Sequence, residues 1–335
     1  MENSCGTTKK ILGLCGDPNG VSTYRIIRPL QKIGADVISN TSKEKLVFGE
    51  ISKTFDKYDV VIIKYILEKD LAAELLAAKC QAQSRNPNFK LYVDIDDDVF
   101  NIPKSSKVVQ KFWTPDAKVI FRFFIKNVDG LICSTQNLAD KFKKYNPNVH
   151  VVPNKVITSQ WARKSIQDGI KIGWTFSLSH VEDIPVIREA LQIIKQKYPE
   201  VTIETTEGLI GGVTQPIKGV PFTRFHEWLP SRGWDIAIAP LKDNAFNKGK
   251  SNIKWLESTM AGAAFVCSDV ATYEAVEHGV TGLKCKTTKD WVNNLSKLIE
   301  DRDLRNTLWS NARAVIEKDW SVESDTSYVN LYNNL

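Results

Sequence analysis

Short continuous runs of apolar residues alternate with stretches of helical periodicity along the first half of the chain. The apolar runs, which predict buried strands, lie at residues 9–16, 58–63, 89–95, 128–134 and 149–154. Helices are expected between them, at residues 23–33, 69–80 and 114–127. The last of these begins with Thr114 as a predicted N-cap and Pro115 at the first helical position. Continuous apolar strands that alternate with helices are typical of a parallel sheet covered on both faces.

The pattern restarts after a polar stretch at residues 155–169. Further strands are expected at residues 169–176, 201–208, 234–241 and 263–269, with helices at 183–197 and 289–317. We therefore predict an α/β protein with two Rossmann-like parallel-sheet domains that face a cleft. The predicted domains are residues 1–154 and 155–318, and we expect residues 319–335 to pack back toward the first domain. Ligands of such sheets bind beyond the carboxyl ends of the strands.

Composition and charge narrow the class of protein only slightly. The chain has 335 residues, enough for two hydrophobic cores, and 45 Lys and Arg against 39 Asp and Glu give a net charge of +6. That excess suits a phosphate-rich partner without requiring one. The absence of a long apolar run and of an apolar N-terminal signal core argues against a transmembrane or secreted protein. The six cysteines form no Cys-x-x-Cys pair, so we expect reduced, buried thiols and a cytoplasmic location.

The segment at residues 246–282 contains the strongest functional signal. A helix is expected at residues 251–261, and the steps of four and three place Lys250, Lys254 and Glu257 along one side of it. Positive charge at a helix N-terminus costs about 0.3–1 kcal/mol, and a bound anion reverses that cost. The pattern indicates a diphosphate site beside a carboxylate that can accept bonds from two ribose hydroxyls. The alternative is a solvated face of Lys and Glu side chains.

The order of residues along this segment resembles the C-terminal donor site of GT-B glycosyltransferases of the retaining family-four type. The matching features are, in order, Glu257, Ala261-Gly262, the strand from Ala264 to Cys267, Tyr273-Glu274 and Thr281-Gly282. The resemblance covers the C-terminal half well and the N-terminal half loosely. It implies that Glu257 binds the ribose of a nucleotide-sugar donor and that the end at Lys250 and Ser251 binds the diphosphate, with Lys254 adding charge.

The segment departs from the family at the residue expected to contact the sugar. A second Glu usually precedes the ribose Glu by eight residues, and that position is Gly249 here. The nearest substitutes are Asp243, Asn244 and Asn247 in the loop just before it.

A second departure concerns the first loop of the C-terminal domain, which lacks the Arg/Lys pair of many relatives. Ser177 and Ser179 in that loop are the expected neutral donors to phosphate oxygens, with charge supplied by Lys250 and Lys254.

The loop after the first strand is a second candidate site. The resemblance implies that Gly16, Asp17 and Arg25 approach the donor phosphate or the acceptor, because glycines permit close approach of the backbone. The spacing of Gly13, Gly16 and Gly20 matches neither the dinucleotide fingerprint nor a P-loop. The alternative is a tight strand-to-helix turn followed by a surface arginine.

Asp94, Asp96, Asp97 and Asp98 form the densest acidic cluster, at the carboxyl end of a predicted strand. In a GT-B enzyme this cluster lines the acceptor side, so Asp96 or Asp98 is the expected group that orients or deprotonates the acceptor hydroxyl. Other readings are the metal-binding Asp-x-Asp of GT-A enzymes, the nucleophile of a haloacid-dehalogenase-like phosphatase, and a solvated N-cap.

Basic residues 104–126 are interleaved with aromatic residues and suggest peripheral contact with a membrane or a nucleic acid. Lys118, Arg122 and Lys126 repeat every four residues beside Val119, Phe123 and Phe124. A solvated basic face with an apolar stripe beneath it is the alternative.

These features together predict a hexosyl- or pentosyltransferase that uses a nucleotide diphosphate sugar, above all a UDP-sugar. The expected acceptor is a hydroxyl on a glycan, a lipid or a hydroxymethylated DNA base, since some viral DNA-modifying glycosyltransferases share the fold. We expect no tightly bound cofactor and no metal requirement, because Lys250, Lys254 and the helix end stabilise the leaving diphosphate. Retention and inversion both stay open. The alternatives are a non-catalytic protein that binds a nucleotide-sugar or polyanion, and an Asp-based phosphatase.

Overall fold

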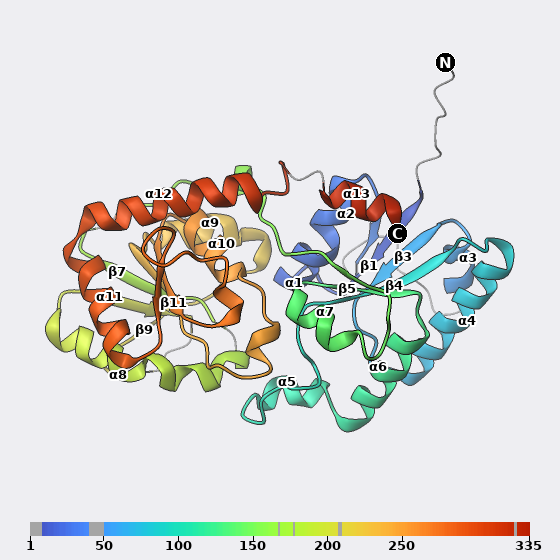
Figure 1. Ribbon diagram of the computed structural model, residues 1–335, viewed down its shortest axis with the longest axis horizontal. Coiled ribbons are helices and arrows are strands. Elements are labelled where there is room, and N and C mark those ends of the chain that lie inside the picture. The colour runs from blue at the N-terminus through green and yellow to red at the C-terminus, as the bar shows by residue number, and fades with distance from the viewer. Residues whose placement is uncertain (1–8, 40–49, 167, 177, 207–209, 325–326) are drawn as a thin grey trace, which may run out of the picture. The chain divides into compact units, whose positions relative to one another are not determined.

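The computed structural model describes residues 9–39, 50–166, 168–176, 178–206, 210–324 and 327–335. Over these residues the chain forms two compact α/β units (Figure 1). The first unit comprises residues 1–97, 112–153 and 325–335, and the second comprises residues 98–111 and 154–324. Each unit contains a parallel sheet of six strands, so the predicted fold class is confirmed.

The sheet of the first unit has the strand order β2-β1-β3-β4-β5-β6. Its strands are β1 (Ile11–Leu14), β2 (Asp36–Ile38), β3 (Val60–Ile63), β4 (Lys90–Ile95), β5 (Gly130–Cys133) and β6 (Val149–Val151). Its helical segments are α1 (Gly20–Ser22), the π-helix η1 (Thr23–Ile27), α2 (Arg28–Lys32), α3 (Ile51–Phe55), α4 (Lys69–Arg85), α6 (Pro115–Asn127), α7 (Gln136–Phe142) and α13 (Ser327–Asn334). Every residue of β1, β3 and β5 is buried, as expected for strands covered on both faces.

Helices cover both faces of this sheet (Figure 1). On one face, Ile26 of η1 and Leu30 of α2 pack with alternate residues of the strands, including Ile11 and Ile62. The last residues of the chain join this core through Tyr332 and Leu335. Helices α3, α4 and α6 lie on the other face. Packing of helices on both faces holds the carboxyl ends of β1, β3 and β4 in place.

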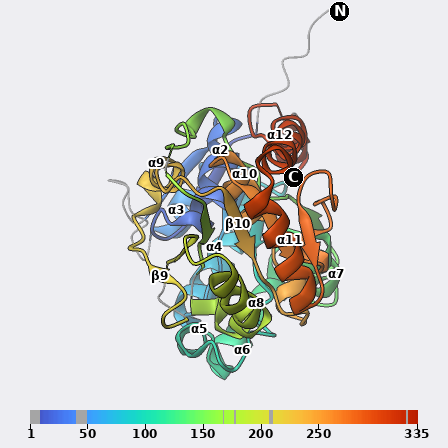
Figure 2. The same cartoon turned by 90° about the vertical axis from the view of Figure 1, so that its left-hand side faces the viewer.

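The sheet of the second unit has the order β12-β11-β10-β7-β8-β9. Its strands are β7 (Lys171–Trp174), β8 (Thr202–Thr205), β9 (Gln215–Pro216), β10 (Ile236–Ala239), β11 (Ala264–Ser268) and β12 (Leu283–Cys285). Its α-helices are α8 (Ile184–Lys197), α9 (Phe225–Ser231), α10 (Ile253–Met260), α11 (Thr288–Glu300) and α12 (Arg302–Asp319), while α5 (Lys107–Phe112) spans the chain boundary between the units. Helices α8 and α11 lie side by side against one face (Figures 1 and 2), where Ile187 and Leu295 enter the same core.

Strand order reverses once in each sheet. The first sheet runs outward in both directions from β1 and β3, and the second from β7 and β10. Such a switch point opens a crevice beyond the carboxyl ends of the two strands, and open α/β sheets bind ligands there. The loops after β1, β3, β7 and β10 are therefore the places to look for a site.

Several local expectations are corrected by the structure. The edge strands β2, β9 and β12 were not predicted, and the helix expected at residues 23–33 contains the π-helix η1. The thiol of Cys80 is exposed rather than buried. No helix among the described residues is long and apolar enough to cross a membrane.

Candidate functional site

Asp183 joins the loops that follow the two switch-point strands of the second sheet. It ends the 3-10 helix η3 (Leu178–Asp183), which follows β7, and it is buried. Its Oδ2 bonds with Nδ1 of His180 at 2.8 Å, and its Oδ1 accepts bonds of 2.8 Å from the amide of Lys242 and from Nδ2 of Asn247. Because Lys242 and Asn247 follow β10, one carboxylate fixes both loops at the switch point.

A cavity of about 200 Å³ opens beside these loops. Thr175 and Phe176 line it after β7, Thr206 lines it after β8, and Phe225 and Trp228 line it from α9. His180 and Lys254 complete the lining on the side of α10. Aromatic rings, hydroxyls and one cation in a single cavity suit a ligand with a flat ring and polar groups.

Helix α10 begins beside this cavity without a capping side chain. Asn252 occupies the N-cap position but makes no side-chain bond to the helix, and the first turn contains no acidic residue. Lys254 lies in that turn, with its Nζ 3.1 Å from Oε2 of Glu257. Free helix N–H groups, the helix dipole and the lysine all favour an anion at this end.

Glu257 has a fixed position because its helix is anchored at several points. The indole of Trp255 donates to the carbonyl oxygen of Thr281 at 3.3 Å, and that of Trp309 donates to the carbonyl oxygen of Thr259 at 2.8 Å. The Glu257 side chain is only 5% exposed. Burying a carboxylate costs free energy unless it is paired and hydrogen-bonded, and Lys254 is its ion-pair partner.

Lys250 lies before α10 rather than in its first turn, so the helical stripe expected from the sequence is corrected. It follows the 3-10 helix η5 (Asn247–Gly249), and its Nζ lies 4.6 Å from the ring centroid of Phe246. The neighbouring Ser251 accepts a 2.8 Å bond at its Oγ from Nδ2 of Asn154. Lys250 and Lys254 both act electrostatically on His180, so the two cations share one region with the loop after β7.

Asn247 is buried in the scaffold of the same region. Besides its bond to Asp183, its Nδ2 donates to the carbonyl oxygen of Lys242 at 2.9 Å, and its own carbonyl accepts a 2.6 Å bond from Oγ1 of Thr272. Its contact with a donor sugar stays a prediction. Of the two predicted phosphate-binding serines, Ser177 lies outside the described residues, and Ser179 is described only by its backbone within η3.

We expect His180 to make the stability of the protein depend on pH. Burial is the largest cause that lowers the pKa of His180, and the nearby Lys250 and Lys254 act in the same direction. A bond from Asp183 opposes them, and the resulting pKa is about 4. Between pH 6.5 and 4 the unfolded chain binds a proton that the folded chain does not, so stability falls as pH falls through this window. Above pH 6.5 the effect vanishes.

The measurement is chemical denaturation at pH 7.5 and pH 5.0. Between pH 7.5 and pH 5.0, the free energy of unfolding of His180→Gln should fall by about 2 kcal/mol less than that of the wild type. The same substitution at the exposed His278 is the control and should keep the wild-type dependence. Equal pH dependence in wild type and His180→Gln would contradict the expected burial of a neutral imidazole.

Arg25 lies in a buried ion-pair network of the first unit and not on its surface. Its guanidinium donates to both carboxylate oxygens of Asp94, at 2.7–3.2 Å, and to the carbonyl oxygen of Val152. The Nζ of Lys64 lies 2.9 Å from Asp94. Burial alone would raise the pKa of Asp94, but Arg25 and Lys64 outweigh it and lower the pKa. The expected contact of Arg25 with phosphate or acceptor would break these bonds, so we do not propose it.

The two predicted catalytic acids have different surroundings. Asp96 follows β4, and its Oδ1 accepts a 2.9 Å bond from Lys64 and a short bond from the hydroxyl of Tyr65. Asp98 belongs to the second unit, where its Oδ2 accepts a 2.9 Å bond from Asn101 and its side chain is buried. Asp96 is the more accessible of the two. We therefore prefer Asp96 for a role in proton transfer.

Gly16 and Asp17 are exposed in the loop after β1. Their roles stay predictions. In the part of the chain that the structure describes, no group of three or more His, Cys, Asp or Glu side chains could hold a metal ion.

Sequence reasoning missed four residues of the second unit that shape the site: Asp183, Thr206, Phe225 and Trp228. Asp183 and Thr206 have no local motif, because their partners are distant in sequence. The aromatic spacing of Phe222, Phe225 and Trp228 was a usable signal for a ring-binding wall.

Helix α6 exposes an apolar stripe beside a basic one. Val119 and Phe123 are one helical turn apart and are 60% and 58% exposed. Lys118, Arg122 and Lys126 follow the adjacent row of the same helix. The expected core stripe is formed instead by Ala117, Phe121, Phe124 and Ile125.

Comparison with known proteins gives likeness in fold only. No protein-family model and no curated protein sequence matches the chain. The structure of HepE from Anabaena in complex with UDP and glucose is similar over 98% of this chain and 100% of that one, with 15% identity and a TM-score of 0.69. Sucrose-phosphate synthase from Thermosynechococcus elongatus is similar over 97% and 98%, with 11% identity and a TM-score of 0.62. TarM from S. aureus matches over 85% of this chain and 57% of its own length, with 14% identity and a TM-score of 0.58. The predicted GT-B fold is thereby confirmed.

Proposed function

We propose that this protein is a glycosyltransferase that transfers a sugar from a UDP-sugar to an acceptor hydroxyl. One observation supports this most: the loops after β7 and β10 and the uncapped, cationic start of α10 converge at the switch point of the second sheet. The similarity in fold to HepE also supports the proposal, because HepE was solved in complex with UDP-glucose and with UDP.

The UDP-sugar is proposed to bind across the loops after β7 and β10 and the start of α10. The diphosphate binds at Lys250, Ser251 and Lys254, where charge and helix dipole both favour an anion. The ribose hydroxyls donate to Glu257. The base enters the neighbouring 200 Å³ cavity against Phe225 and Trp228.

The chemistry follows from where charge develops. The bond between the anomeric carbon and the diphosphate oxygen breaks, and the leaving UDP gains negative charge. Lys250, Lys254 and the start of α10 stabilise that charge because their positive ends are already oriented toward it. The hydroxyl oxygen of the acceptor molecule forms the new bond to the anomeric carbon and loses its proton. Asp96 is the proposed base that takes this proton. Asp183 and Asn247 act as positioning residues that hold the loops.

The test is turnover of a panel of nucleotide-sugars by the purified chain, with and without EDTA. We expect release of UDP from a UDP-sugar at a rate that EDTA does not change. UDP binding without turnover would favour the non-catalytic alternative. Mg²⁺-dependent release of inorganic phosphate would favour the phosphatase, and absence of donor binding would contradict the proposal.

We further propose that α6 contacts an anionic lipid surface. Exposed Val119 and Phe123 supply apolar contact, and Lys118, Arg122 and Lys126 complement anionic headgroups. Nucleic acid binding would use the cations without needing the apolar pair. The replacement of both Val119 and Phe123 by serine should weaken binding to phosphatidylglycerol vesicles at least about tenfold in co-sedimentation, from the lost burial of apolar area.

The control is Ile193→Ser, which removes a partly exposed apolar residue from α8. It should bind vesicles as the wild type does. If the Val119 and Phe123 replacement leaves vesicle binding unchanged, or if only DNA is bound, the lipid proposal is wrong.

A further inference from the structure

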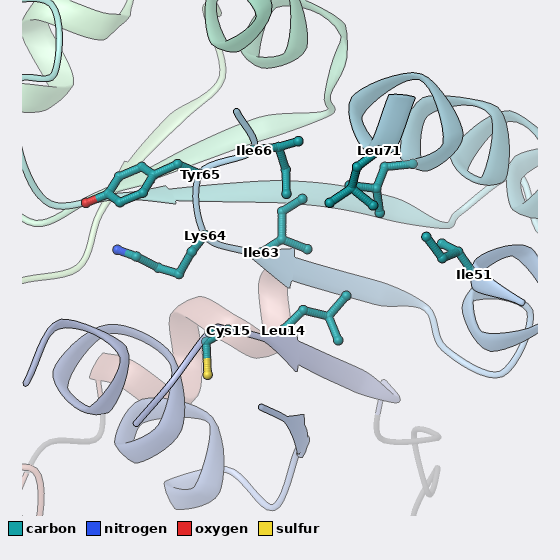
Figure 3. Close-up of a pocket in the computed structure, with 10 residues that line it drawn as sticks. Leu14, Cys15, Ile51, Ile63, Lys64, Tyr65, Ile66 and Leu71 are labelled. Atoms are coloured by element: carbon teal, nitrogen blue, oxygen red, sulfur yellow. The ribbon is translucent and has the colours of Figure 1, made fainter. Parts of the chain in front are cut away.

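A second and larger cavity, of about 350 Å³, lies at the switch point of the first sheet. Leu14 and Ile63 end the strands β1 and β3 there, and Ile51 of α3 and Leu71 of α4 line the far side (Figure 3). Leu75 of α4 also lines the cavity. The lining is predominantly apolar. Its volume falls in the usual range of about 300–1,000 Å³ for small-molecule sites, and such sheets bind ligands at this point.

The polar side chains that border this cavity already have partners. Lys64 bonds to Asp94 and Asp96, and Tyr65 donates to Asp96. Their polar ends point away from Leu71 and Ile51 (Figure 3), so the cavity faces the stem of the lysine and the ring of the tyrosine. Burial raises the pKa of the Cys15 thiol, which bonds to Ser22 and is neutral near pH 7.

A hydroxyl-rich ligand would therefore lose hydrogen bonds to water in this cavity and recover few of them. Burying an unpaired polar group costs about 1–3 kcal/mol, whereas apolar surface gains about 25 cal/mol per Å². The occupant that these walls favour is a chain of methylene groups or an apolar ring.

We infer that the acceptor of this protein is an amphiphile whose apolar group fills the cavity between Leu14, Ile63 and Leu71. The inference rests on the proposed transferase function and names the class of its acceptor. Cys15, Lys64 and Tyr65 lie at the end of the cavity nearest Asp96. An acceptor seated with its tail toward Leu71 thus presents its hydroxyl head at the Asp96 end. Acceptors made only of sugar, or a nucleobase within DNA, do not have the matching apolar part.

The inference is tested with butyl, hexyl and octyl β-glucosides, titrated calorimetrically into the full chain below their micelle concentrations. Affinity should rise about fourfold per added methylene group, which is what burial of one methylene from water gives. Glucose alone should bind at least about a hundredfold more weakly than octyl glucoside.

Matched substitutions on α4 locate the binding. Leu71→Trp fills the cavity and should weaken octyl glucoside binding more than tenfold, while Leu76→Trp, at a half-buried position on the same helix outside the lining, should not. Leu71→Gln leaves the space but adds an amide, and should also weaken binding. Circular dichroism and denaturant unfolding of all three variants should match the wild type, which shows that the first unit of each variant is folded. UDP affinity, measured in parallel, should also be unchanged.

Affinity that does not depend on chain length, or that Leu71→Trp and Leu71→Gln leave unchanged, would overturn the inference. A protein that binds the alkyl series as predicted but binds no UDP would instead contradict the proposed donor site. The two failures are thus distinguishable.

Discussion

Replacing Glu257 by alanine is expected to weaken the binding of UDP by between about tenfold and a hundredfold. The estimate comes from hydrogen bonds to a charged group, which contribute about 1.5–3 kcal/mol. The carboxylate is buried in a helix anchored by Trp255 and Trp309, so no neighbouring side chain can easily move into its place. Isothermal titration of UDP measures the effect.

Titration of uridine separates the role of Glu257 from that of its partner Lys254. Glu257→Ala should weaken uridine and UDP by similar factors, since both contain the ribose. Lys254→Ala should weaken UDP more than uridine, because its target is the diphosphate. Glu317→Ala on the exposed part of α12 is the matched control and should change neither affinity. Full UDP affinity in Glu257→Ala would remove the ribose role.

Asp94→Asn is expected to destabilise the protein by about 3–5 kcal/mol, the cost of breaking a buried ion pair from one side. Asp94 is fully buried between Arg25 and Lys64, so the variant leaves two buried cations with Asp96 as their remaining nearby carboxylate. Denaturant unfolding followed by circular dichroism measures the change. Asp140→Asn, on the exposed surface of α7, is the control and should lie within about 0.5 kcal/mol of wild type.

The same network predicts a pH dependence with a definite sign. The pKa of Asp94 is lower in the folded protein than its ordinary value of 3.8. The stabilisation that Asp94 gives the folded state is therefore fully present above pH 3.8 and is lost as the pH falls through the folded pKa. Asp94→Asn should therefore lose less stability than wild type on acidification below pH 4. The double change of Arg25→Met with Asp94→Leu should recover much of the lost stability, since apolar replacements of buried pairs are often tolerated. A stable Asp94→Asn protein would mean that the pair is less buried than described.

The interior strands were predictable because their signal is local. β1, β3 and β4 are short apolar runs, and a strand buried on both faces has no other pattern available. The edge strands β2 and β9 escaped prediction because their residues are partly or fully exposed, which leaves little hydrophobic pattern. The start of α10 was placed two residues early, since the long-range bond between Asn154 and Ser251 is invisible in the sequence.

The candidate site was predictable only where its residues share one segment. Lys250, Lys254 and Glu257 are close in sequence, so their grouping followed from spacing. Asp183 was missed because its partners Lys242 and Asn247 lie 59 and 64 residues away.

Arg25 shows the same limit. It was expected to approach a phosphate or the acceptor, or else to lie on the surface, because its partner Asp94 is 69 residues distant and cannot be recognised in the sequence. A charged residue beside a glycine-containing loop suggests a ligand, and only the fold reveals that its charge is already neutralised in the core.

The central claim is that the second unit binds the donor at the start of α10, and a crystal structure of the protein with UDP tests it most directly. The account predicts the diphosphate within hydrogen-bond distance of Lys250, Ser251 or Lys254, and the ribose hydroxyls on Glu257. UDP bound instead in the cavity after β1 and β3, or held through the aspartates after β4, would contradict it.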